Sequence, residues 1–287
     1  MTPLSRYTTL GTGGPAKEFA KPRTVAEVEA LLRRAAADGL AVATVGLGSN
    51  LLVADEGVDA LVLRLEGELA AVEVEGDLLR AGGGAANAVA LHRARDAGLG
   101  EFEFACAIPG TIGGGVWMNA GAYEGDFSEV LERALVATAE GTDWLTPHEL
   151  GLSYRHSHLR HGQVVVGAEL RLYPRPAAEV KERVRELNAR RKAAQPTNKR
   201  TFGSVFKNPD HELSAGQMLD ACGLRGFRVG GAQISPKHAN FIENAGGATT
   251  EDALALMAEA RRRAREQYGV ELHHEVEFLG EIDLPAT

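Results

Sequence analysis

The clearest helical pattern in the chain covers residues 24–39. Its apolar positions fall on one stripe, as in a helix with one buried face: Val25, Val28, Leu31, Leu32 and Ala35. Thr24 and Glu27 stand at the spacing of a capping box, and Gly39 follows the last apolar position. This segment is therefore predicted to form a capped helix.

Short β-branched runs follow this helix and predict strands. The segment 41–65 reads as strand, turn, strand, loop, strand, and residues 68–84 read as two strands joined by a Gly-Asp turn. An amphipathic pattern over 85–98 predicts a second helix. The glycine-rich run 108–125 is then expected to interrupt regular structure.

The second half of the chain continues with both kinds of element. Residues 130–146 predict a hairpin and 164–174 a further strand. A helix over 177–194 is expected to end before Pro196, because proline disfavours helix in the residue before it. A long helix should run from Thr249 to about Tyr268, with Gly269 ending it.

The C-terminal segment 271–280 alternates and is predicted to be one strand. Glu275 and Glu277 would share one face, and Val276 and Phe278 the other. One of the two carboxylates could be a catalytic acid, while simple surface exposure is the ordinary alternative.

Composition narrows the class of protein. The 287 residues have a net charge of −8, and the 31 Lys and Arg residues are scattered, so nucleic acid is a poor candidate partner. Cys106 and Cys222 lie far apart without metal-site spacing, and we expect buried thiols in a reducing compartment. No secretory signal pattern and no apolar run of about 20 residues is visible, so we expect a soluble, cytoplasmic protein without a membrane segment.

The turn in "VGLGSNLLV" (45–53) is a candidate phosphate site. Successive backbone N–H groups without bulky side chains can form a nest for a phosphate oxygen, and Ser49 and Asn50 add donors. The alternative is a glycine turn required only by sterics. Neither of the two best-known phosphate motifs is present.

A second loop, "PGTIGGGVWMNAGAYEG" (109–125), contains six glycines. Such glycines are costly in backbone entropy and are kept where φ must be positive or another group must approach closely. A purely structural loop is the alternative. Two glycine-rich loops together favour a large, flat, phosphate-bearing ligand, and a flavin fits that description.

The segment "LSYRHSHLR" (152–160) offers Arg155 as a planar fork for a carboxylate. A polar surface loop is the alternative. His156 and His158 have no identifiable third ligand, so the sequence does not favour a metal site.

In "TFGSVFKNP" (201–209), Ser204 lacks the setting of a hydrolase nucleophile, and no recognisable triad accompanies it. It could instead donate a proton to a carbanion-like centre, or simply cap a turn. Lys207 and Asn208 would suit phosphate or sugar oxygens. Residues 225–247 are dense in groups that suit sugar recognition, although a solvated loop is the ordinary reading; these groups are Gln233, Lys237, His238 and Asn240.

Seven segments in one order resemble the UDP-N-acetylenolpyruvoylglucosamine reductase family of cell-wall synthesis over nearly the whole chain. They are "TLGTGGPA", "GLGSNLLV", "IPGTIGGGVWMNAGAY", "SYRHS", "GSVFKNP", "GGAQISPKHANFIEN" and "HEVEFLG". Each is moderately specific, and the seven in order are highly specific.

The resemblance implies an α+β fold. It implies a two-subdomain FAD-binding domain of the vanillyl-alcohol-oxidase (PCMH) type over 1–175, with subdomains of about 1–65 and 66–175. A connecting helix, 176–194, would lead to a smaller α/β substrate-binding domain, 195–287, whose C-terminal strand returns to the active site. It further implies FAD, NADPH as reductant, a sugar-nucleotide substrate in peptidoglycan synthesis, and no obligate protein partner.

The resemblance also assigns residue roles. Arg155 would pair with the substrate carboxylate or enolate, Glu275 would assist its polarisation, and Ser204 would protonate the carbon beside the carboxylate. The residues implied for FAD belong to the two glycine-rich loops: Gly46, Leu47, Gly48, Ser49, Asn50, Leu51, Pro109, Gly110, Thr111, Gly113, Gly114, Asn119, Gly121, Ala122 and Tyr123. Those expected for the substrate are Lys207, Asn208, Gln233, Lys237, His238 and Asn240.

Two features depart from the family pattern. His273 and His274 replace the acidic residue and proline that often precede the C-terminal glutamate, and no long insertion fits between Leu172 and Gln195, as in a compact subtype. Two other functions stay open. One is a flavin oxidase, for which His92 or Cys106 is a conceivable covalent tether. The other is a non-catalytic sugar-nucleotide-binding protein, against which the joint retention of Arg155, Ser204 and Glu275 argues.

Overall fold

The chain forms two compact units, and neither is one continuous segment. The computed structural model describes residues 1–123 and 125–284. Unit 1 comprises Met1–Lys17, Gly48–Asp59 and Lys192–Thr287, and unit 2 comprises Glu18–Leu47 and Ala60–Arg191. The predicted limits at 175 and 195 separate an FAD-binding domain from a substrate-binding domain, and they stay predictions.

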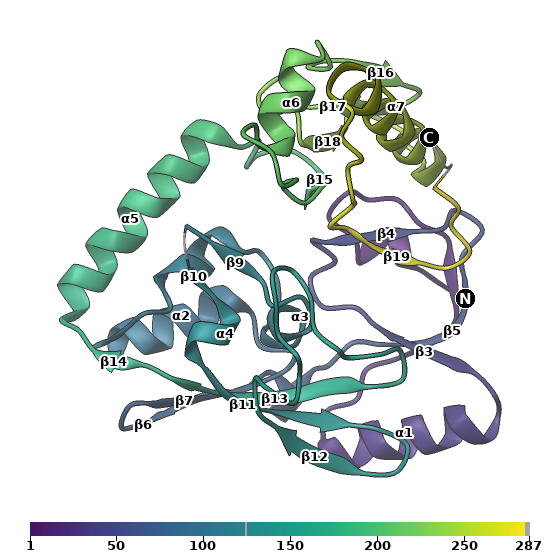
Figure 1. Ribbon diagram of the computed structural model, residues 1–287. Helices are drawn as coiled ribbons and strands as arrows, with labels where there is room; N and C mark the ends of the chain where they lie inside the picture. The colour runs from purple at the N-terminus through teal and green to yellow at the C-terminus, as the bar shows by residue number, and fades with distance from the viewer. Residues whose placement is uncertain (124, 285–287) are drawn as a thin grey trace. The chain divides into compact units, whose positions relative to one another are not determined.

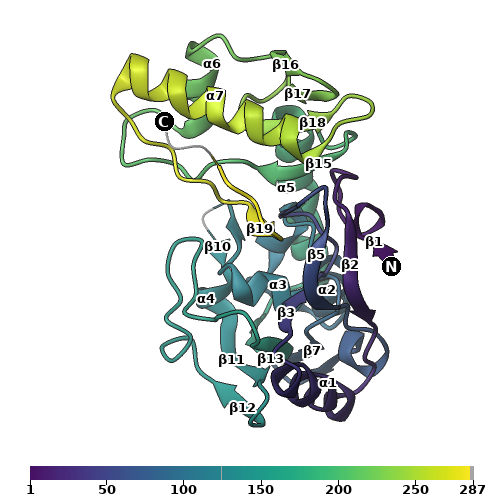
Figure 2. The ribbon, with the colours of Figure 1, turned by 90° about the vertical axis from the view of Figure 1, so that its right-hand side faces the viewer.

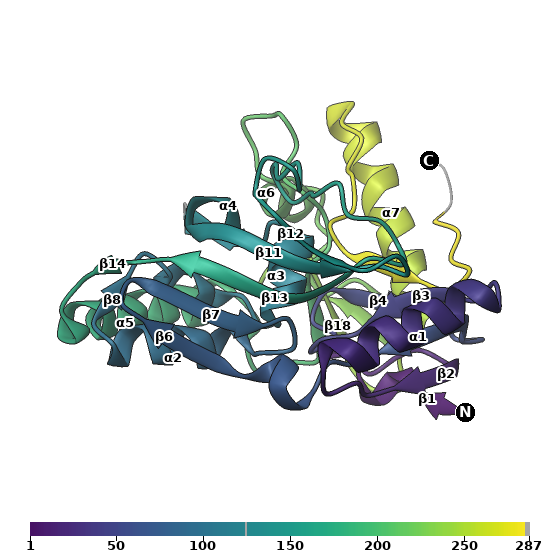
Figure 3. The same ribbon diagram turned by 90° about the horizontal axis from the view of Figure 1, so that it is seen from below.

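The main sheet of unit 2 has five antiparallel strands. In spatial order these are β12 (Thr142–Leu145), β11 (Leu131–Ala137), β13 (Val164–Arg171), β7 (Leu78–Gly82) and β6 (Val72–Glu75). Figure 3 shows β13 between β11 and β7. Both predicted hairpins are confirmed, with β6 paired to β7 and β11 to β12. The first begins later than predicted, because Gly67–Ala70 forms a short 3-10 helix, η2.

The first predicted helix is α1 (Val25–Ala37), whose face packs on the parallel pair β3 (Ala41–Thr44) and β5 (Val58–Leu63) (Figure 3). Its N-cap is Thr24, which accepts a hydrogen bond from the Glu27 N–H. The capping box is only half formed, because the Glu27 carboxylate accepts from the Arg23 N–H. The second helix, α2 (Asn87–Asp96), is also confirmed.

The other elements of unit 2 are short except for α5. They are β8 (Leu99–Gly100), η3 (Glu103–Ala107), α3 (Ile112–Trp117), β9 (Gly121–Ala122), β10 (Gly125–Asp126), α4 (Phe127–Val130) and β14 (Tyr173–Pro174). The predicted helix over 177–194 is confirmed as α5 (Ala177–Ala194), in which the chain passes from unit 2 to unit 1.

The expectation that 108–125 lacks regular structure is wrong, because α3 lies inside this run. Thr111 caps the helix by accepting from the Gly114 N–H, which offsets the low helix propensity of its glycines. Gly115 faces the ring of Phe127, and a Cβ there would lie 2.2 Å from the ring. Phe127 packs edge-to-face on Phe102 and Phe104, so this glycine is needed for close packing.

Unit 1 is built on a four-stranded antiparallel sheet covered by two helices. The sheet order is β15 (Thr201–Ser204), β18 (Phe241–Asn244), β17 (Ala232–Ile234) and β16 (Arg228–Val229). Figures 1 and 2 show α6 (Ala215–Ala221) and α7 (Thr250–Tyr268) beside it, and their apolar faces share one core with the sheet. The predicted ends of α7 are confirmed by a capping box at Thr249 and by Gly269 at φ 68°.

Two short pairings complete unit 1. β1 (Thr2–Pro3) pairs with the start of β2 (Pro15–Ala20), and a 3-10 helix, η1 (Leu4–Arg6), follows β1. β4 (Leu51–Val53) pairs in parallel with β19 (Glu277–Leu279).

The predicted C-terminal strand over 271–280 is wrong in extent. Only Glu277–Leu279 is strand, because the ladder with β4 begins at the pair Glu277 and Leu51. Glu275 lies before the strand, and its N–H donates to the carbonyl of Val205. The shared strand face predicted for Glu275 and Glu277 is therefore not present.

Two further predictions concern the cysteines and membrane-spanning helices. Cys106 and Cys222 are free thiols, but both are half-buried and not fully buried as predicted. Burial raises the pKa of each thiol. Within the described residues, no helix combines the length and apolar character needed to cross a membrane.

A pair of alanine substitutions in α3 tests the packing against Phe127. Gly115→Ala should lower the free energy of unfolding by about 1–3 kcal/mol, because its Cβ would overlap the ring. Gly114→Ala is the matched control, since its Cβ would meet only the Thr111 hydroxyl at 3.5 Å. Urea unfolding of the flavin-free proteins measures both. Equal stability of the two variants would contradict the packing.

The acid side of the stability curve tests an ion-pair cluster on α7. Glu259 accepts hydrogen bonds from Arg262 and Arg263, which lower the pKa of Glu259 from 4.5 to about 2. A lowered folded-state pKa stabilises the fold above about pH 4.5, and this contribution is lost as the pH falls toward 2.

The unfolding free energy of wild type minus that of Glu259→Gln should therefore be constant above pH 4.5 and shrink below it. Glu266→Gln is the control, since this carboxylate also pairs with Arg262 but is 61% exposed and should matter less. A difference that stays constant from pH 5 to pH 2 would refute the assignment.

Candidate active site

The loop 46–50 has the geometry of a phosphate nest. Gly48 has φ 64°, and a Cβ on it would lie 1.9 Å from the Tyr7 carbonyl oxygen, so only glycine fits. Among the described residues, no acceptor receives the backbone N–H of Gly46, Leu47, Gly48 or Asn50. Consecutive N–H groups that are not used within the protein suit the pyrophosphate of a dinucleotide, so this loop fits FAD.

The second glycine-rich loop lies against the first within unit 2. A Cβ on Gly46 would lie 2.7 Å from the hydroxyl of Thr111, the N-cap residue of α3. Leu47 is the next residue along and is 42% exposed, which offers an apolar surface beside the nest. Pro109, Gly110, Gly113 and Gly114 flank Thr111 in the same loop and helix.

The glycine run 82–84 supports this loop. From the sequence it was predicted only to end a strand. The carbonyl of Gly83 accepts from the Gly113 N–H at 2.8 Å, and the carbonyl of Ala85 accepts from the Ile112 N–H at 2.8 Å. A Cβ on Gly83 would lie 1.9 Å from the Val165 carbonyl oxygen. The three consecutive glycines at 82–84 were the available signal for this close approach.

Strained backbone gathers around the second loop. Four non-glycine residues among those described have positive φ, and three are predicted site residues: Asn119 (41°), Tyr123 (53°) and Arg155 (52°). Such conformations cost about 1–3 kcal/mol each and cluster at functional sites.

Asn119 and Tyr123 already have partners within unit 2. The Asn119 amide donates to the Ser153 carbonyl and accepts from the Ser128 N–H. The Tyr123 hydroxyl donates to the Leu187 carbonyl, and burial raises the pKa of Tyr123. Both residues therefore shape the loop, whatever else they bind.

Arg155 is fixed beside the same loop. Its guanidinium donates to the carbonyl of Gly121, which together with Ala122 forms β9, and it lies 5.0 Å from the ring centroid of Tyr154. The segment around it is not extended, because Ser153 and His156 pair across a turn. A guanidinium held in this way is preorganised for a carboxylate.

Unit 1 joins Ser204, Glu275 and the first loop through the backbone. Ser204 ends β15, and the next residue, Val205, accepts from the Glu275 N–H at 2.8 Å. The Glu275 carbonyl accepts from the side-chain amide of Asn50 at 3.1 Å. Ser49 and Asn50 form the turn before Leu51, the first residue of β4. The predicted catalytic residue Glu275, the residue after Ser204 and the predicted FAD loop thus belong to one hydrogen-bonded group.

The predicted substrate residues are all in unit 1, and several of their polar groups have protein partners. The Lys207 N–H donates to the His273 carbonyl, and the Asn208 side chain accepts from the Ala215 N–H at the start of α6. The Gln233 amide donates to the Gly226 carbonyl and accepts from Arg228.

The remaining three lie around the turn between β17 and β18. The Lys237 ammonium donates to the Lys192 carbonyl. Burial lowers the pKa of His238, and its Nδ1 accepts from the Asn240 N–H. Asn240 is only 4% exposed, and its amide bonds the backbone of Phe206. Their assignment to the substrate stays a prediction.

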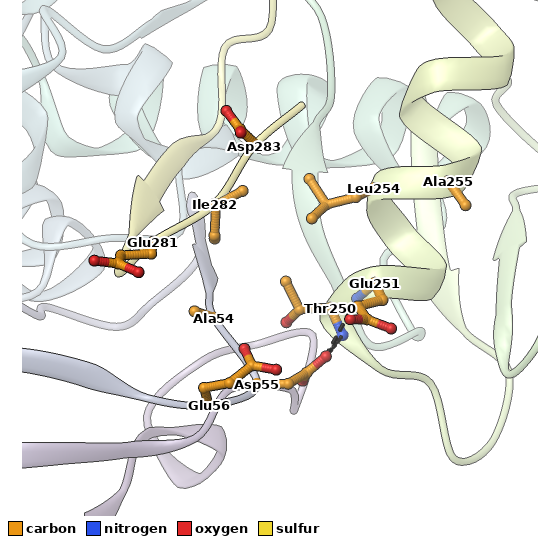
Figure 4. Close-up of a pocket in the computed structure, with 10 residues that line it drawn as sticks. All are labelled: Ala54, Asp55, Glu56, Thr250, Glu251, Leu254, Ala255, Glu281, Ile282 and Asp283. Carbon is orange, nitrogen blue, oxygen red and sulfur yellow. Dashed lines mark hydrogen bonds between the residues drawn. The ribbon is translucent and has the colours of Figure 1, made fainter. Parts of the chain in front are cut away.

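A pocket of about 350 Å³ in unit 1 contains none of the predicted site residues (Figure 4). Asp55 accepts there from the backbone N–H groups of Thr250 and Glu251, at the start of α7. The lining is acidic and would repel phosphate groups: Ala54, Asp55, Glu56, Thr250, Glu251, Leu254, Ala255, Glu281, Ile282 and Asp283. Within the part of the chain that the structure describes, no cluster of His, Cys, Asp or Glu could hold a metal ion.

Comparison with known families assigns both parts of the chain. Residues 16–144 match the model of an FAD binding domain, and residues 195–279 match the C-terminal domain of UDP-N-acetylenolpyruvoylglucosamine reductase. The fold and the glycine loops thus define a flavin-dependent oxidoreductase.

Individual relatives agree over almost the whole chain. It is 44% identical over 281 residues to UDP-N-acetylenolpyruvoylglucosamine reductase 2 of Symbiobacterium thermophilum, which covers 97% of this chain and 91% of the relative. It is 42% identical over 280 residues to the reductase of Anaeromyxobacter dehalogenans, covering 98% and 85%. The crystal structure of the reductase (MurB) from Thermus caldophilus superposes with a TM-score of 0.84 at 39% identity, covering 96% and 97%.

The chain belongs to the UDP-N-acetylenolpyruvoylglucosamine reductase family. The resemblance inferred from the seven segments is confirmed. The α+β fold class with an FAD-binding domain is confirmed as well.

A matched pair of glycine substitutions tests the phosphate nest. Gly48→Ala should weaken FAD binding at least tenfold, because its Cβ overlaps the Tyr7 carbonyl and must displace the loop. Gly76→Ala is the control, because Gly76 has φ 61° but open space around it. The control suffers the same backbone strain, about 1–2 kcal/mol, without the overlap.

Titration of flavin-free protein with FAD, followed by flavin fluorescence, measures the affinity. Equal FAD affinities for the two variants would show that the loop does not hold the cofactor.

Proposed function

We propose that the protein reduces the enolpyruvyl group of UDP-N-acetylglucosamine enolpyruvate to give UDP-N-acetylmuramate, with FAD as cofactor and NADPH as reductant. This reaction belongs to peptidoglycan synthesis and through it to cell-wall biogenesis, cell shape and division. Family membership supports the reaction. In this chain, the observation that supports the proposed reaction is the hydrogen-bonded group of Asn50, Glu275 and the residue after Ser204.

Bound FAD would supply the hydride chemistry, by which hydride from NADPH would reach the terminal carbon of the enolpyruvyl group. Negative charge then develops on the adjacent carbon and its carboxylate. In this proposal the Arg155 guanidinium binds that carboxylate, and Glu275 assists its polarisation. Groups fixed where charge develops give the largest contribution to many enzymatic rates.

The hydroxyl of Ser204 is proposed to give its proton to the carbon beside the carboxylate. This role requires an accurate position and no neighbouring histidine. Ser204 follows a register shift in β15, and such irregularities often redirect a side chain toward a functional site.

The residues first proposed to bind the sugar nucleotide are Lys207, Asn208, Gln233, Lys237, His238 and Asn240. We also propose a cytoplasmic setting without nucleic acid or an obligate protein partner. Turnover by the purified chain alone tests the last point.

The function is tested by incubating the purified flavoprotein with NADPH and the enolpyruvyl sugar nucleotide. NADPH oxidation should require that substrate, and mass spectrometry should find a product heavier by two hydrogen atoms. NADPH oxidation at the same rate with oxygen alone would favour the oxidase reading. Substrate binding without any turnover would favour a non-catalytic binding protein.

Ser204→Ala should separate the two half-reactions. Flavin reduction by NADPH should be nearly unchanged, because it needs no proton from Ser204. Flavin reoxidation by the enolpyruvyl substrate should slow by about 10²–10⁴-fold, the usual contribution of a general acid. Anaerobic stopped-flow absorbance measures both rates.

The matched control is Ser214→Ala, in the same unit. Ser214 caps α6 by accepting from the Gln217 N–H, so its loss should cost about 1 kcal/mol of stability and leave both rates unchanged. Similar losses in both half-reactions of Ser204→Ala would mean that Ser204 supports the fold or flavin binding and is not the proton donor.

A further inference from the structure

The residue Asn240 was first grouped with the substrate ligands, but its contacts point to another role. We infer that Asn240 is a positioning residue that holds the backbone after Ser204, so that the Ser204 hydroxyl stays aimed at the carbon it protonates. This inference rests on the proposed function and deepens it.

Ser204 stands at the end of a β-bulge. Thr201 pairs with Glu243 and Ser204 pairs with Phe241, so three steps along β15 oppose two steps along β18. The extra residue is accommodated at Gly203, whose φ is 86°. Bulges of this kind redirect a side chain, but they also remove regular ladder hydrogen bonds. The direction of Ser204 therefore depends on what holds the chain on its C-terminal side.

Asn240 supplies three hydrogen bonds at that point. Its side-chain oxygen accepts from the Phe206 N–H at 2.9 Å, and its side-chain nitrogen donates to the Phe206 carbonyl at 2.8 Å. Its own carbonyl accepts from the Val205 N–H at 2.9 Å. Asn240, through its side chain and its backbone carbonyl, thus acts like a neighbouring strand for the two residues that follow Ser204.

Asn240 is itself held in place. It is 4% exposed, and its backbone N–H donates to Nδ1 of His238 at 3.2 Å. Both ends of its amide are engaged in buried hydrogen bonds, whose loss would leave the Phe206 backbone groups unsatisfied. Such a side chain suits a fixed support better than a sugar ligand.

The opposite side of the same segment bonds to the C-terminal segment. The Val205 carbonyl accepts from the Glu275 N–H, and the Lys207 N–H donates to the His273 carbonyl. Residues 205–207 therefore lie between Asn240 and the segment that contains Glu275. Removing the Asn240 amide takes away both bonds to Phe206 and leaves only the Asn240 backbone carbonyl, bonded to the Val205 N–H, to hold this segment from that side.

Asn240→Ala and Asn240→Asp test the inference in the flavin-loaded enzyme. The aspartate keeps the shape of the side chain and an acceptor for the Phe206 N–H, but it cannot donate to the Phe206 carbonyl while ionised and it buries a charge there. The alanine removes both bonds without a buried charge, and whichever variant folds decides the matter. Both variants should reoxidise reduced flavin about 10–100-fold more slowly at saturating enolpyruvyl sugar nucleotide, because small misplacements cost this much. The Kd for this substrate, from the flavin absorbance change of oxidised enzyme, should stay within about twofold.

A larger solvent isotope effect on reoxidation is also expected, since proton transfer becomes slower. The matched control is Asn244→Ala, in β18, whose amide bonds the Leu10 carbonyl and the Gly246 N–H. It should leave both the saturated rate and the isotope effect unchanged.

Three outcomes would overturn the inference. A tenfold weaker Kd with an unchanged saturated rate would make Asn240 a substrate ligand. Equal slowing in Asn244→Ala would reduce its role to general stability. Unchanged reoxidation in both Asn240 variants would remove the role altogether. Absence of reoxidation in the wild type would instead refute the proposed function, so the two failures are distinguishable.

Discussion

The hydrogen bond from the Glu275 N–H to the Val205 carbonyl is the contact on which the arrangement of the candidate site in unit 1 depends. It joins the C-terminal segment to the chain directly after Ser204. The Asn50 side chain extends the same network to the glycine loop, and the Glu277 N–H returns to the Asn50 carbonyl. Backbone bonds fix these residues more firmly than exposed side-chain contacts could, because buried peptide groups are costly to leave unpaired.

Close approach of backbone is the corresponding constraint around the glycine loops. Gly48 meets the Tyr7 carbonyl in unit 1, while Gly46 and Gly113 meet Thr111 and Gly83 in unit 2. These positions exclude side chains, and no acceptor among the described residues receives the backbone N–H groups of residues 46–48. The entropy cost of so many glycines is thus balanced by shape and by hydrogen-bonding capacity.

Regular elements could be predicted from the sequence where periodicity and caps agree. The helices α1, α5 and α7 and both hairpins of unit 2 follow from apolar spacing, Thr caps, glycine stops and Pro196. The family and its cofactor were predictable from motifs in order. Helix α3 was missed because glycines argue against helix, and its stability comes from Thr111 and from packing on Phe127.

Tertiary partners were beyond the reach of the sequence. Alternation over 271–280 predicts one strand, but the partner of Glu275 is Val205, about 70 residues earlier in the chain. Polar composition marked Asn240 as a ligand candidate, although its amide bonds the backbone of Phe206. Composition indicates which groups can form hydrogen bonds, and only the fold selects the partner.

The predicted FAD loop, the Ser204 strand and the segment of Glu275 form one hydrogen-bonded network. Amide hydrogen exchange of the flavin-free and FAD-loaded protein, read by mass spectrometry on peptides covering 44–53, 201–208 and 270–280, tests it most directly. FAD should slow exchange in the loop peptide and also in the peptides that contain Val205 and Glu275, because Asn50 connects them. Slower exchange in the loop peptide alone, with peptides 201–208 and 270–280 unchanged, would contradict this network.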